Sequence, residues 1–153
     1  ERDYGSDAAL RGVRVESHID PDVPEVDVDP ALLEMALRNL VENALSVSPA
    51  NAALTLTVRT TEAPSRAGLN NEPPVAGRWV AIEVRDCGPG MPSDVLAGDI
   101  STTKPGGTGL GISISRRIAA RHGGTLLIES GPQGTAVRIL LPASRPAVLE
   151  APQ

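Results

Sequence analysis

Two glycine-rich turns carry the residues with the most evident chemistry. The first is Asp-Cys-Gly-Pro-Gly-Met at residues 86–91, and the second is Gly-Thr-Gly-Leu-Gly at residues 107–111. A carboxylate such as Asp86 accepts a hydrogen bond from the amino group of a base, and glycines let backbone N–H groups approach phosphates without a Cβ in the way. An apolar helix is predicted to begin at the second turn, and its N-terminal dipole favours an anion. Together the two turns predict a nucleotide site, although each alone is a weak signal.

A helix predicted from Pro30 to about Val47 carries two further candidates. Asp29 is suited to cap this helix, and Pro30 fits its first position. Asn39 and Asn43 lie one turn apart and therefore share a face, although asparagine is not favoured inside helices. An amide oxygen is a ligand that suits Mg²⁺, whose other positions go to waters and phosphate oxygens. The alternative is that both amides are solvated or cap neighbouring loops, and the glycine turns favour the metal interpretation. The apolar residues of the same helix recur at core spacing: Leu33, Leu37, Leu40, Val41, Ala44 and Leu45.

Three separated motifs occur in an order that resembles a known family. They are Asn-Leu-x-x-Asn-Ala at 39–44, Asp-x-Gly-x-Gly at 86–90 and Thr-Thr-Lys-x-Gly-Gly-Thr-Gly-Leu-Gly at 102–111. The chain resembles the catalytic ATP-binding domain of bacterial sensor histidine kinases, which belong to the GHKL superfamily with gyrase B, Hsp90 and MutL. The resemblance covers about residues 12–142. It implies an α/β fold of the Bergerat type: a two-layer sandwich in which helices cover one face of a mixed, mostly antiparallel sheet.

The resemblance also implies roles at the base and the metal. Asp86 is expected to accept from the adenine amino group, and Thr135 to help through its hydroxyl or a water. Gly88 and Gly90 are expected to shape the base pocket, a role that is compatible with simple turn geometry. Asn43 is expected to ligate Mg²⁺, with Asn39 beside it on the phosphate side.

The phosphates are expected to lie against the second glycine turn and a lid over about residues 92–107. Lys104 is a point charge that reaches the terminal phosphates or stays solvated until the nucleotide arrives. The resemblance assigns the remaining nucleotide contacts to Thr102, Thr103, Gly107, Thr108, Gly109, Leu110 and Gly111.

An amide at position 39 bears on the reaction. Some relatives carry there a glutamate that activates water, whereas Asn39 does not take up a proton near neutral pH. The sequence therefore favours phosphoryl transfer to a protein nucleophile over efficient ATP hydrolysis. Glu42, next to Asn43, is either a group that orients the nucleophile or a solvated carboxylate.

The chain departs from the family pattern in two places. Relatives usually carry a basic residue and an aromatic residue shortly after the second asparagine, where this chain has Ser46 and Val47. The predicted lid also lacks the usual Phe. Each lost contact costs about 1 kcal/mol or more, so the departures predict an affinity weaker by about one to two decades. A degenerate nucleotide-binding scaffold, another GHKL ATPase or a protein serine kinase are therefore the alternative functions.

The phosphoacceptor is expected to lie outside this chain. Of the two histidines, His18 lies in a predicted strand and His122 at the end of a predicted helix, so both are interpreted as structural or solvated. The implied partners are a histidine-bearing dimerisation helical hairpin of the same full-length protein and a response regulator. The isolated chain is predicted to be monomeric, to bind ATP and not to label itself.

Composition sets the remaining bounds. The formal net charge of −5 argues against a nucleic-acid surface, and a single Cys excludes an intrachain disulfide and fits a reducing, cytoplasmic compartment. No run approaches the roughly 20 apolar residues of a membrane span. The start at Glu1 suggests a fragment, so membrane anchoring of the full-length protein stays open. The predicted organisation is a linker or helix end at 1–11, the ATP-binding domain at 12–142 and a flexible tail at 143–153.

The elements that must position these residues follow from periodicity. With one Trp and no Phe, the core is expected to consist of Leu, Ile, Val and Ala. A long loop is predicted at Glu62–Gly77, and Ile114, Ile118 and Ala119 are predicted as the core stripe of the later helix. The predicted strands are Val13–Ile19, Val23–Val28, Ala53–Thr60 and Arg78–Arg85, followed by a helix from Thr108 to about His122 and a hairpin of Thr125–Ser130 with Thr135–Leu141.

Overall fold

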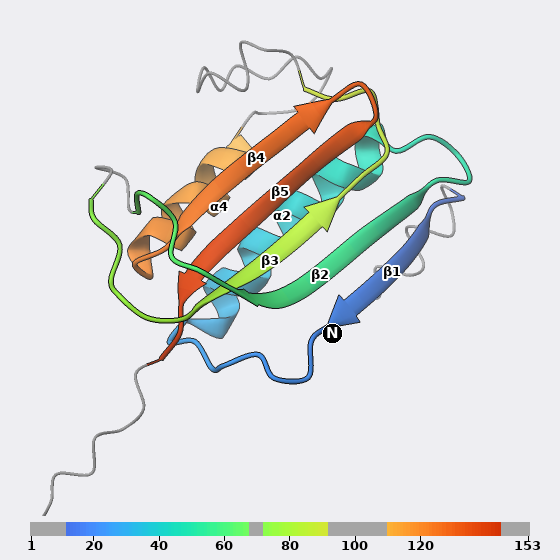
Figure 1. The fold of residues 1–153 in the computed structure, drawn as a ribbon. Coiled ribbons are helices and arrows are strands. Elements are labelled where there is room, and N and C mark those ends of the chain that lie inside the picture. Colours follow the sequence, from blue (N-terminus) through green and yellow to red (C-terminus); the bar gives the residue numbers. More distant parts are fainter. Residues whose placement is uncertain (1–11, 68–71, 92–109, 145–153) are drawn as a thin grey trace, which may run out of the picture.

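The computed structural model describes residues 12–67, 72–91 and 110–144 (Figure 1). In chain order, the described elements are β1 (Arg14–Ile19), α2 (Pro30–Val47), β2 (Ala53–Thr61), β3 (Trp79–Arg85), α4 (Leu110–Arg121), β4 (Thr125–Gly131) and β5 (Gly134–Pro142). The strands form one five-stranded sheet in the order β1-β2-β3-β5-β4. Only the β1–β2 pair is parallel among these described pairings, and the others are antiparallel.

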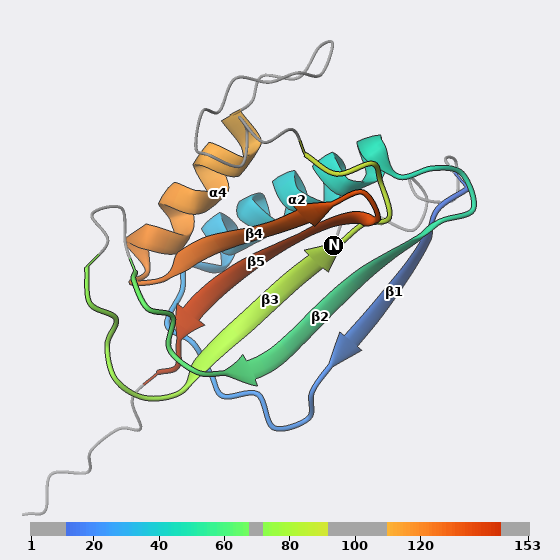
Figure 2. The same ribbon diagram turned by 45° about the horizontal axis from the view of Figure 1, so that its top comes forward.

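Both helices lie on the same face of this sheet (Figure 2). The other face of the sheet, opposite the helices, is called the open face. Along β3 and β5, apolar side chains that point into the core between the two layers alternate with residues of the open face. Val84, Ile139 and Leu141 are almost completely buried in this core. The predicted two-layer α/β fold with a mixed, mostly antiparallel sheet is therefore confirmed.

The α2 helix begins as its sequence predicts. The Oδ1 atom of Asp29 accepts from the N–H groups of Ala31 (3.0 Å) and Leu32 (3.4 Å), and Pro30 occupies the first turn. The predicted apolar face is buried at Leu40, Val41, Ala44 and Leu45 and half-buried at Leu33 and Leu37. Asn39 and Asn43 of the same helix are half-buried.

The α4 helix ends at a pair of glycines, as predicted. Gly123 has a φ of 76°, and the N–H groups of Gly123 and Gly124 donate to the carbonyls of Ala120 and Ala119. This is the Schellman arrangement, which needs a residue that tolerates the left-handed region. The strand β4 can therefore start directly after the helix.

One residue of the predicted α4 stripe is placed differently. Ile118 and Ala119 are buried, but Ile114 is 36% exposed. The neighbouring Ser115 is fully buried instead, because its hydroxyl lies 3.1 Å from the carbonyl oxygen of Ala36 on α2 and 2.9 Å from that of Gly111. A small polar side chain therefore lets the two helices approach closely, which the apolar pattern does not reveal.

His122 connects the end of α4 to the start of α2. Its Nδ1 atom lies 2.8 Å from the carbonyl oxygen of Ile118, and its Nε2 atom accepts from the N–H of Asp29 at 3.0 Å. Accepting at Nε2 requires the neutral ring with its proton on Nδ1. The structural role of His122 is therefore to link the end of α4 to the cap of α2. His18, in contrast, is exposed on β1.

The prediction of a strand at Val23–Val28 is wrong. Within this segment only Val26 makes a β-bridge, and its partner is Ala143. Pro21 and Pro24 lack the N–H that a ladder needs, and the segment runs between β1 and the α2 cap rather than along a sheet edge.

The first residues of the predicted tail are held by this same segment and by Arg78. Ala143 donates its N–H to the carbonyl of Arg78, and Ser144 donates to that of Glu25 at 2.7 Å. Residues 145–153 of the tail lie outside the described part of the chain.

The predicted long loop covers part of the open face of the sheet. Ala67 and Glu72 in this loop pair through their backbone, and Ala67 packs with Trp79, Ala81 and Leu140 in a second apolar cluster. Trp79 is completely buried there, and its indole N–H donates to the carbonyl of Val75 at 3.1 Å. The expectation of a core without aromatic residues is therefore wrong at this one position.

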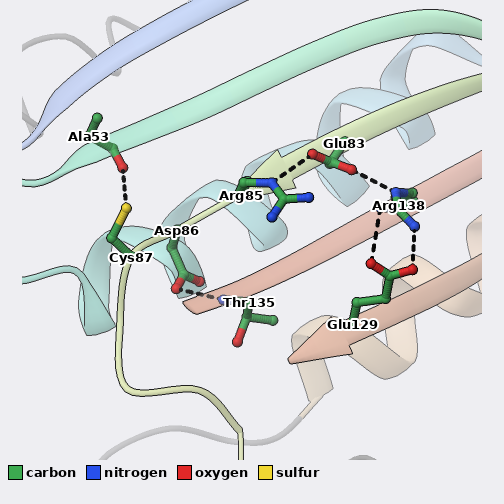
Figure 3. Close-up of polar contacts among 8 residues, drawn as sticks. All are labelled: Ala53, Glu83, Arg85, Asp86, Cys87, Glu129, Thr135 and Arg138. Atoms are coloured by element: carbon green, nitrogen blue, oxygen red, sulfur yellow. Dashed lines mark hydrogen bonds and ion pairs between the residues drawn. The ribbon is translucent and has the colours of Figure 1, made fainter. Parts of the chain in front are cut away.

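An ionic network lies on the open face of β3, β4 and β5 (Figure 3). Arg138 on β5 donates to Glu83 on β3 at 2.6 Å and forms a two-pronged pair with Glu129 on β4. Arg85 also donates to Glu83, at 3.1 Å. Burial raises the pKa of Glu83, but the hydrogen bonds and charges of both arginines outweigh it, so the pKa lies below its usual value. These pairs join three neighbouring strands on the face opposite the helices.

Candidate nucleotide site

The candidate site lies where several elements end together. The carboxyl ends of β3 and β4, the amino end of β5, the C-terminus of α2 and the N-terminus of α4 all point to the same end of the sandwich (Figures 1 and 2). Asp86 follows β3 directly, and Gly111 lies in the first turn of α4. Two predicted motifs that are far apart in sequence are therefore held at one end of the fold.

The Asp86 side chain is fixed by two backbone amides, of which Figure 3 shows that of Thr135. Its Oδ1 atom accepts from the N–H of Gly88 at 2.9 Å and from that of Thr135 at 3.2 Å. The residue is 8% exposed, and its own N–H donates to the carbonyl of Thr135. A carboxylate held through one oxygen leaves the other oxygen to accept from a ligand. The next side chain, Cys87, is exposed, and its thiol donates toward the carbonyl of Ala53 on β2 at 3.5 Å.

The turn after Asp86 packs directly on the β4–β5 hairpin. Gly134 has a φ of 140°, and a Cβ there would overlap the carbonyl oxygen of Asp86. Gly90 has a φ of 89°, and a Cβ there would overlap the carbonyl oxygen of Gly131. The glycines of the first motif are therefore needed for close backbone approach as well as for turn geometry.

A pair of hydroxyls lies beneath this turn. The Oγ atom of Ser130 lies 2.8 Å from the Oγ1 atom of Thr135, and it accepts the N–H of Met91 at 2.6 Å. Thr135 is 4% exposed. The predicted contact residue Thr135 is thus brought beside Asp86, and its hydroxyl is engaged with Ser130.

Ser130 is a residue of the site that the sequence motifs do not indicate. A signal for it exists, because a two-residue turn at Pro132–Gln133 pairs Gly131 with Gly134 and sets Ser130 opposite Thr135. Directly opposed residues of an antiparallel pair lie on the same face with their Cβ atoms close together. The predicted hairpin, with strands that end at Ser130 and begin at Thr135, has this same register, and the observed strands add the Gly131–Gly134 pair.

Asn39 and Asn43 meet the start of α4. A Cβ on Gly111 would lie 3.3 Å from the Nδ2 atom of Asn43 and 3.6 Å from the Cβ of Asn39. Both asparagines are half-buried, and Gly111 is the last glycine of the second motif. The two amides therefore lie beside a helix N-terminus that has no acidic residue in its first turn.

The end of α2 forms another side of the site. Glu42 is exposed, and the Ser46 hydroxyl donates to the carbonyl of Asn43 at 2.7 Å. A Cβ on Gly88 would lie 2.9 Å from the carbonyl oxygen of Val47 and 3.0 Å from its Cγ2 atom. Val47 thus packs against the turn that follows Asp86.

Several predicted phosphate contacts fall outside the described residues. These are Thr102, Thr103, Lys104, Gly107, Thr108 and Gly109, and of Leu110 only its place as the first residue of α4 is described.

A preformed, carboxylate-rich metal centre is absent from the described part of the chain, where no group of three or more His, Cys, Asp or Glu side chains is arranged to hold a metal ion. Neutral amides at Asn39 and Asn43 suit a Mg²⁺ ion that arrives with its phosphates, since Mg²⁺ keeps few protein ligands and completes its shell with phosphate oxygens and water. The residues present therefore fit a metal–nucleotide complex better than a free ion.

Comparison with known proteins decides the family. Residues 28–145 match the family described as histidine kinase-, DNA gyrase B- and HSP90-like ATPase. The chain belongs to this family. The match includes both asparagines, Asp86 and both glycine motifs.

Individual relatives agree with this assignment. The chain is 33% identical over 138 residues to the sensory histidine kinase/phosphatase NtrB of Vibrio alginolyticus, covering 88% of this chain and 39% of that protein. The corresponding protein of Klebsiella oxytoca is 36% identical over 134 residues, covering 85% of this chain and 37% of its own length. The chain thus spans about two fifths of the length of these relatives.

Solved structures give the same fold. The catalytic domain of the histidine kinase ThkA matches with a TM-score of 0.72 at 24% identity, covering 92% of this chain and 85% of that one. Full-length ShkA in complex with AMPPNP matches with a TM-score of 0.70 at 25% identity, covering 95% of this chain and 29% of that one.

Neither described helix of the present chain has the length and apolarity that a membrane crossing requires.

Proposed function

We propose that this chain is the catalytic ATP-binding domain of a two-component sensor histidine kinase. In this role it positions Mg-ATP for transfer of the γ-phosphoryl group to a histidine on a separate helical hairpin, and a response regulator then receives the phosphoryl group. The observation that carries the proposal is the meeting of Asn39 and Asn43 with Gly111 at the same sheet end as the fixed Asp86 carboxylate.

The base end of the site is built for recognition of an amino group. Asp86 is held through Oδ1 by two backbone amides, so its second oxygen is the acceptor for the adenine amino group. The close contact of Gly88 with Val47 places the end of α2 beside this group. A planar base is therefore expected to lie against the turn, beside the end of α2.

The phosphate end combines a helix dipole with amides. The N-terminus of α4 favours an anion, and a glycine motif before it would leave backbone N–H groups accessible to phosphates. Asn43 would hold Mg²⁺, with Asn39 beside it, and the ion when bound would neutralise charge on the phosphate oxygens. Lys104, Thr102 and Thr103 are proposed from the sequence as further phosphate contacts.

The chemistry expected of the chain is positioning and not proton abstraction from water. Phosphoryl transfer depends mainly on alignment and charge stabilisation, and the Asn39 amide is not a base. Glu42 is exposed one residue before Asn43 and is therefore accessible to an incoming histidine, which it would orient. The two histidines of this chain are a solvated strand residue and a helix link, which supports an acceptor outside it.

The similarity to histidine kinases supports this function. NtrB carries the name of a sensory histidine kinase/phosphatase, and ShkA has been crystallised with AMPPNP. As a domain of such a protein the chain would act in the cytoplasm, whether or not the full-length protein is anchored to a membrane.

The test is made in two steps. Calorimetric titration of the 153-residue chain with ATP and Mg²⁺ is expected to show saturable binding. Radiolabelled ATP is then mixed with the chain, with and without the separately produced histidine hairpin of the same full-length protein. Label is expected on the hairpin only when both are present, and never on the chain alone.

A non-catalytic scaffold is the second candidate. Its specific support is the aliphatic Val47 at the contact with Gly88, where relatives usually carry an aromatic residue near the base. Absence of heat at millimolar ATP would favour this candidate and reject the kinase proposal for the isolated chain. Saturable binding without transfer to the hairpin would retain the nucleotide site and reject the catalytic role.

A further inference from the structure

The Ser130 hydroxyl occupies a junction between three parts of the candidate site. It accepts the N–H of Met91, which ends the first glycine motif, at 2.6 Å. It also lies 2.8 Å from the hydroxyl of Thr135, whose N–H donates to Asp86. Ser130 itself lies on β4, so a single hydroxyl joins the turn, β4 and β5 beside the fixed carboxylate.

The proton count at this junction allows two arrangements, because either hydroxyl can donate to the other. A serine hydroxyl has one proton and two lone pairs, and one lone pair of Ser130 is used by Met91. The Ser130 proton is then available for the Oγ1 atom of Thr135, which is within hydrogen-bond distance. In that arrangement Thr135 accepts from Ser130 and retains its own proton as a donor.

We propose that Ser130 is a positioning residue that directs the hydroxyl proton of Thr135 toward the nucleotide base. The inference rests on the proposed nucleotide-binding function and adds a determinant of base selection. The site then presents two neighbouring groups of opposite character: the free oxygen of Asp86 as acceptor and the hydroxyl of Thr135 as donor.

This pair has a defined chemical complement. Adenine offers an amino donor at C6 next to a ring-nitrogen acceptor at N1, which matches an acceptor beside a donor. Guanine offers the reverse, a carbonyl acceptor at C6 next to a protonated N1, so it would face the Asp86 carboxylate with a lone pair. Sites that hydrogen-bond a substrate group discriminate strongly against an analogue that lacks the group, because their own polar atoms are left unpaired.

The competing explanation is purely structural. Ser130 also holds the Met91 amide, and Gly90 packs on the neighbouring Gly131. If holding the turn were its only effect, removal of the hydroxyl would weaken all nucleotides by the same factor. A comparison of two nucleotides that differ only at N1 separates the two explanations.

The experiment measures the dissociation constants of ADP and 1-deaza-ADP, in which a C–H replaces N1, by calorimetry on the complete chain. We expect the wild type to prefer ADP by about tenfold, the size of one hydrogen bond to a buried group. Ser130→Ala is expected to reduce this preference to less than about threefold, since the Thr135 proton is no longer directed. Ser130→Thr keeps a hydroxyl and is expected to restore the wild-type ratio, and Ser17→Ala on β1 serves as the matched control with an unchanged ratio.

The outcomes separate this inference from the function on which it rests. Absence of ADP binding by the wild type would overturn the proposed function itself. ADP binding with no preference over 1-deaza-ADP, or an equal loss for both nucleotides in Ser130→Ala, would overturn the role of Ser130 and leave the nucleotide site intact. If Ser130→Ala does not fold, Ser130→Cys replaces the hydroxyl with a weak donor of similar size, and an unchanged ratio in that variant would overturn the proposal.

Discussion

Replacement of Asp86 by asparagine should separate the binding role of this side chain from its structural role. The Oδ1 atom accepts from the N–H groups of Gly88 and Thr135, and an asparagine carbonyl oxygen can accept both. The amide nitrogen then replaces the free carboxylate oxygen, so that a donor faces the amino donor of the base. The fold should therefore persist while recognition of the base is lost.

The magnitudes follow from the hydrogen bonds involved. A hydrogen bond to a charged group contributes about 1.5–3 kcal/mol, so Asp86→Asn should weaken ADP binding by about one to two decades. Its free energy of unfolding should fall by no more than about 1 kcal/mol, since both backbone contacts keep an acceptor. Asp86→Ala instead leaves two buried N–H groups without that acceptor, each at a cost of about 1–3 kcal/mol, so this variant should lose about 2–6 kcal/mol of stability.

The assay combines calorimetry with urea unfolding. Trp79 is the only tryptophan of the chain and is completely buried, so its fluorescence reports unfolding directly. Asp20→Asn, at an exposed position before α2, gives the same change of charge and should leave both quantities unaltered. A folded Asp86→Asn variant that binds ADP within twofold of the wild type would refute the assignment of the free oxygen to the base. Equal stability of the alanine and asparagine variants would refute the energetic role given to the backbone contacts.

Three further predictions concern stability. Gly134→Ala places a Cβ on the carbonyl oxygen of Asp86, and urea unfolding should show a loss of about 3 kcal/mol or more. The pKa of Glu83 lies below the ordinary value of 4.5 because the hydrogen bonds and charges of its arginine partners outweigh its burial. The ionised Glu83 therefore contributes its full stabilisation above about pH 4.5 and loses it as the pH falls through the lower native pKa. In urea unfolding measured at several pH values, the free energy of unfolding of Glu83→Gln should fall less steeply with acid than that of the wild type. His122→Ala removes one hydrogen bond to the start of α2 and one to the carbonyl of Ile118 within α4, and it should cost about 1–2 kcal/mol in thermal denaturation.

Each of these predictions has a matched control within the chain. Gly77 has a φ of 119° but open space around its Cβ position, so Gly77→Ala isolates the backbone strain from the overlap at Gly134. Glu16→Gln and His18→Ala change exposed side chains of β1 and should leave stability unchanged. Equal losses of stability in Gly134→Ala and Gly77→Ala would contradict the overlap at Gly134. An acid loss of stability that Glu83→Gln does not change would contradict the role given to Glu83. A His122→Ala variant as stable as the wild type would contradict the role given to the His122 hydrogen bonds.

Local signals are sufficient for the helices and for most of the strands. Asp29 and Pro30 specify the start of α2, and Gly123 with Gly124 specifies the end of α4, because caps depend on neighbours in the sequence. The failed strand at Val23–Val28 shows the limit of such signals. Alternating apolar residues indicate a face, but a strand also needs an edge with which to pair.

The apolar pattern of α4 is informative only in part. Ile114 matches the stripe by spacing, yet the contact with α2 is made by Ser115 through the carbonyl of Ala36. The angle at which two helices cross decides which row of side chains is covered, and that angle depends on both partners. The burial of Trp79 under the long loop has the same origin, since the covering residue comes from another segment.

The residue types of the candidate site are evident from the sequence by itself. Carboxylate, amide and glycine chemistry is carried by short motifs, so the motifs alone are enough to indicate Asp86, Asn43 and Gly111 as candidates. What only the tertiary structure decides is how these motifs meet: Asp86 is fixed by the N–H of Thr135, and Ser130 joins that residue to Met91. Short motifs encode local geometry and chemistry, whereas strand register and helix crossing arise from contacts between segments far apart in the chain, and those contacts determine which atoms face the ligand.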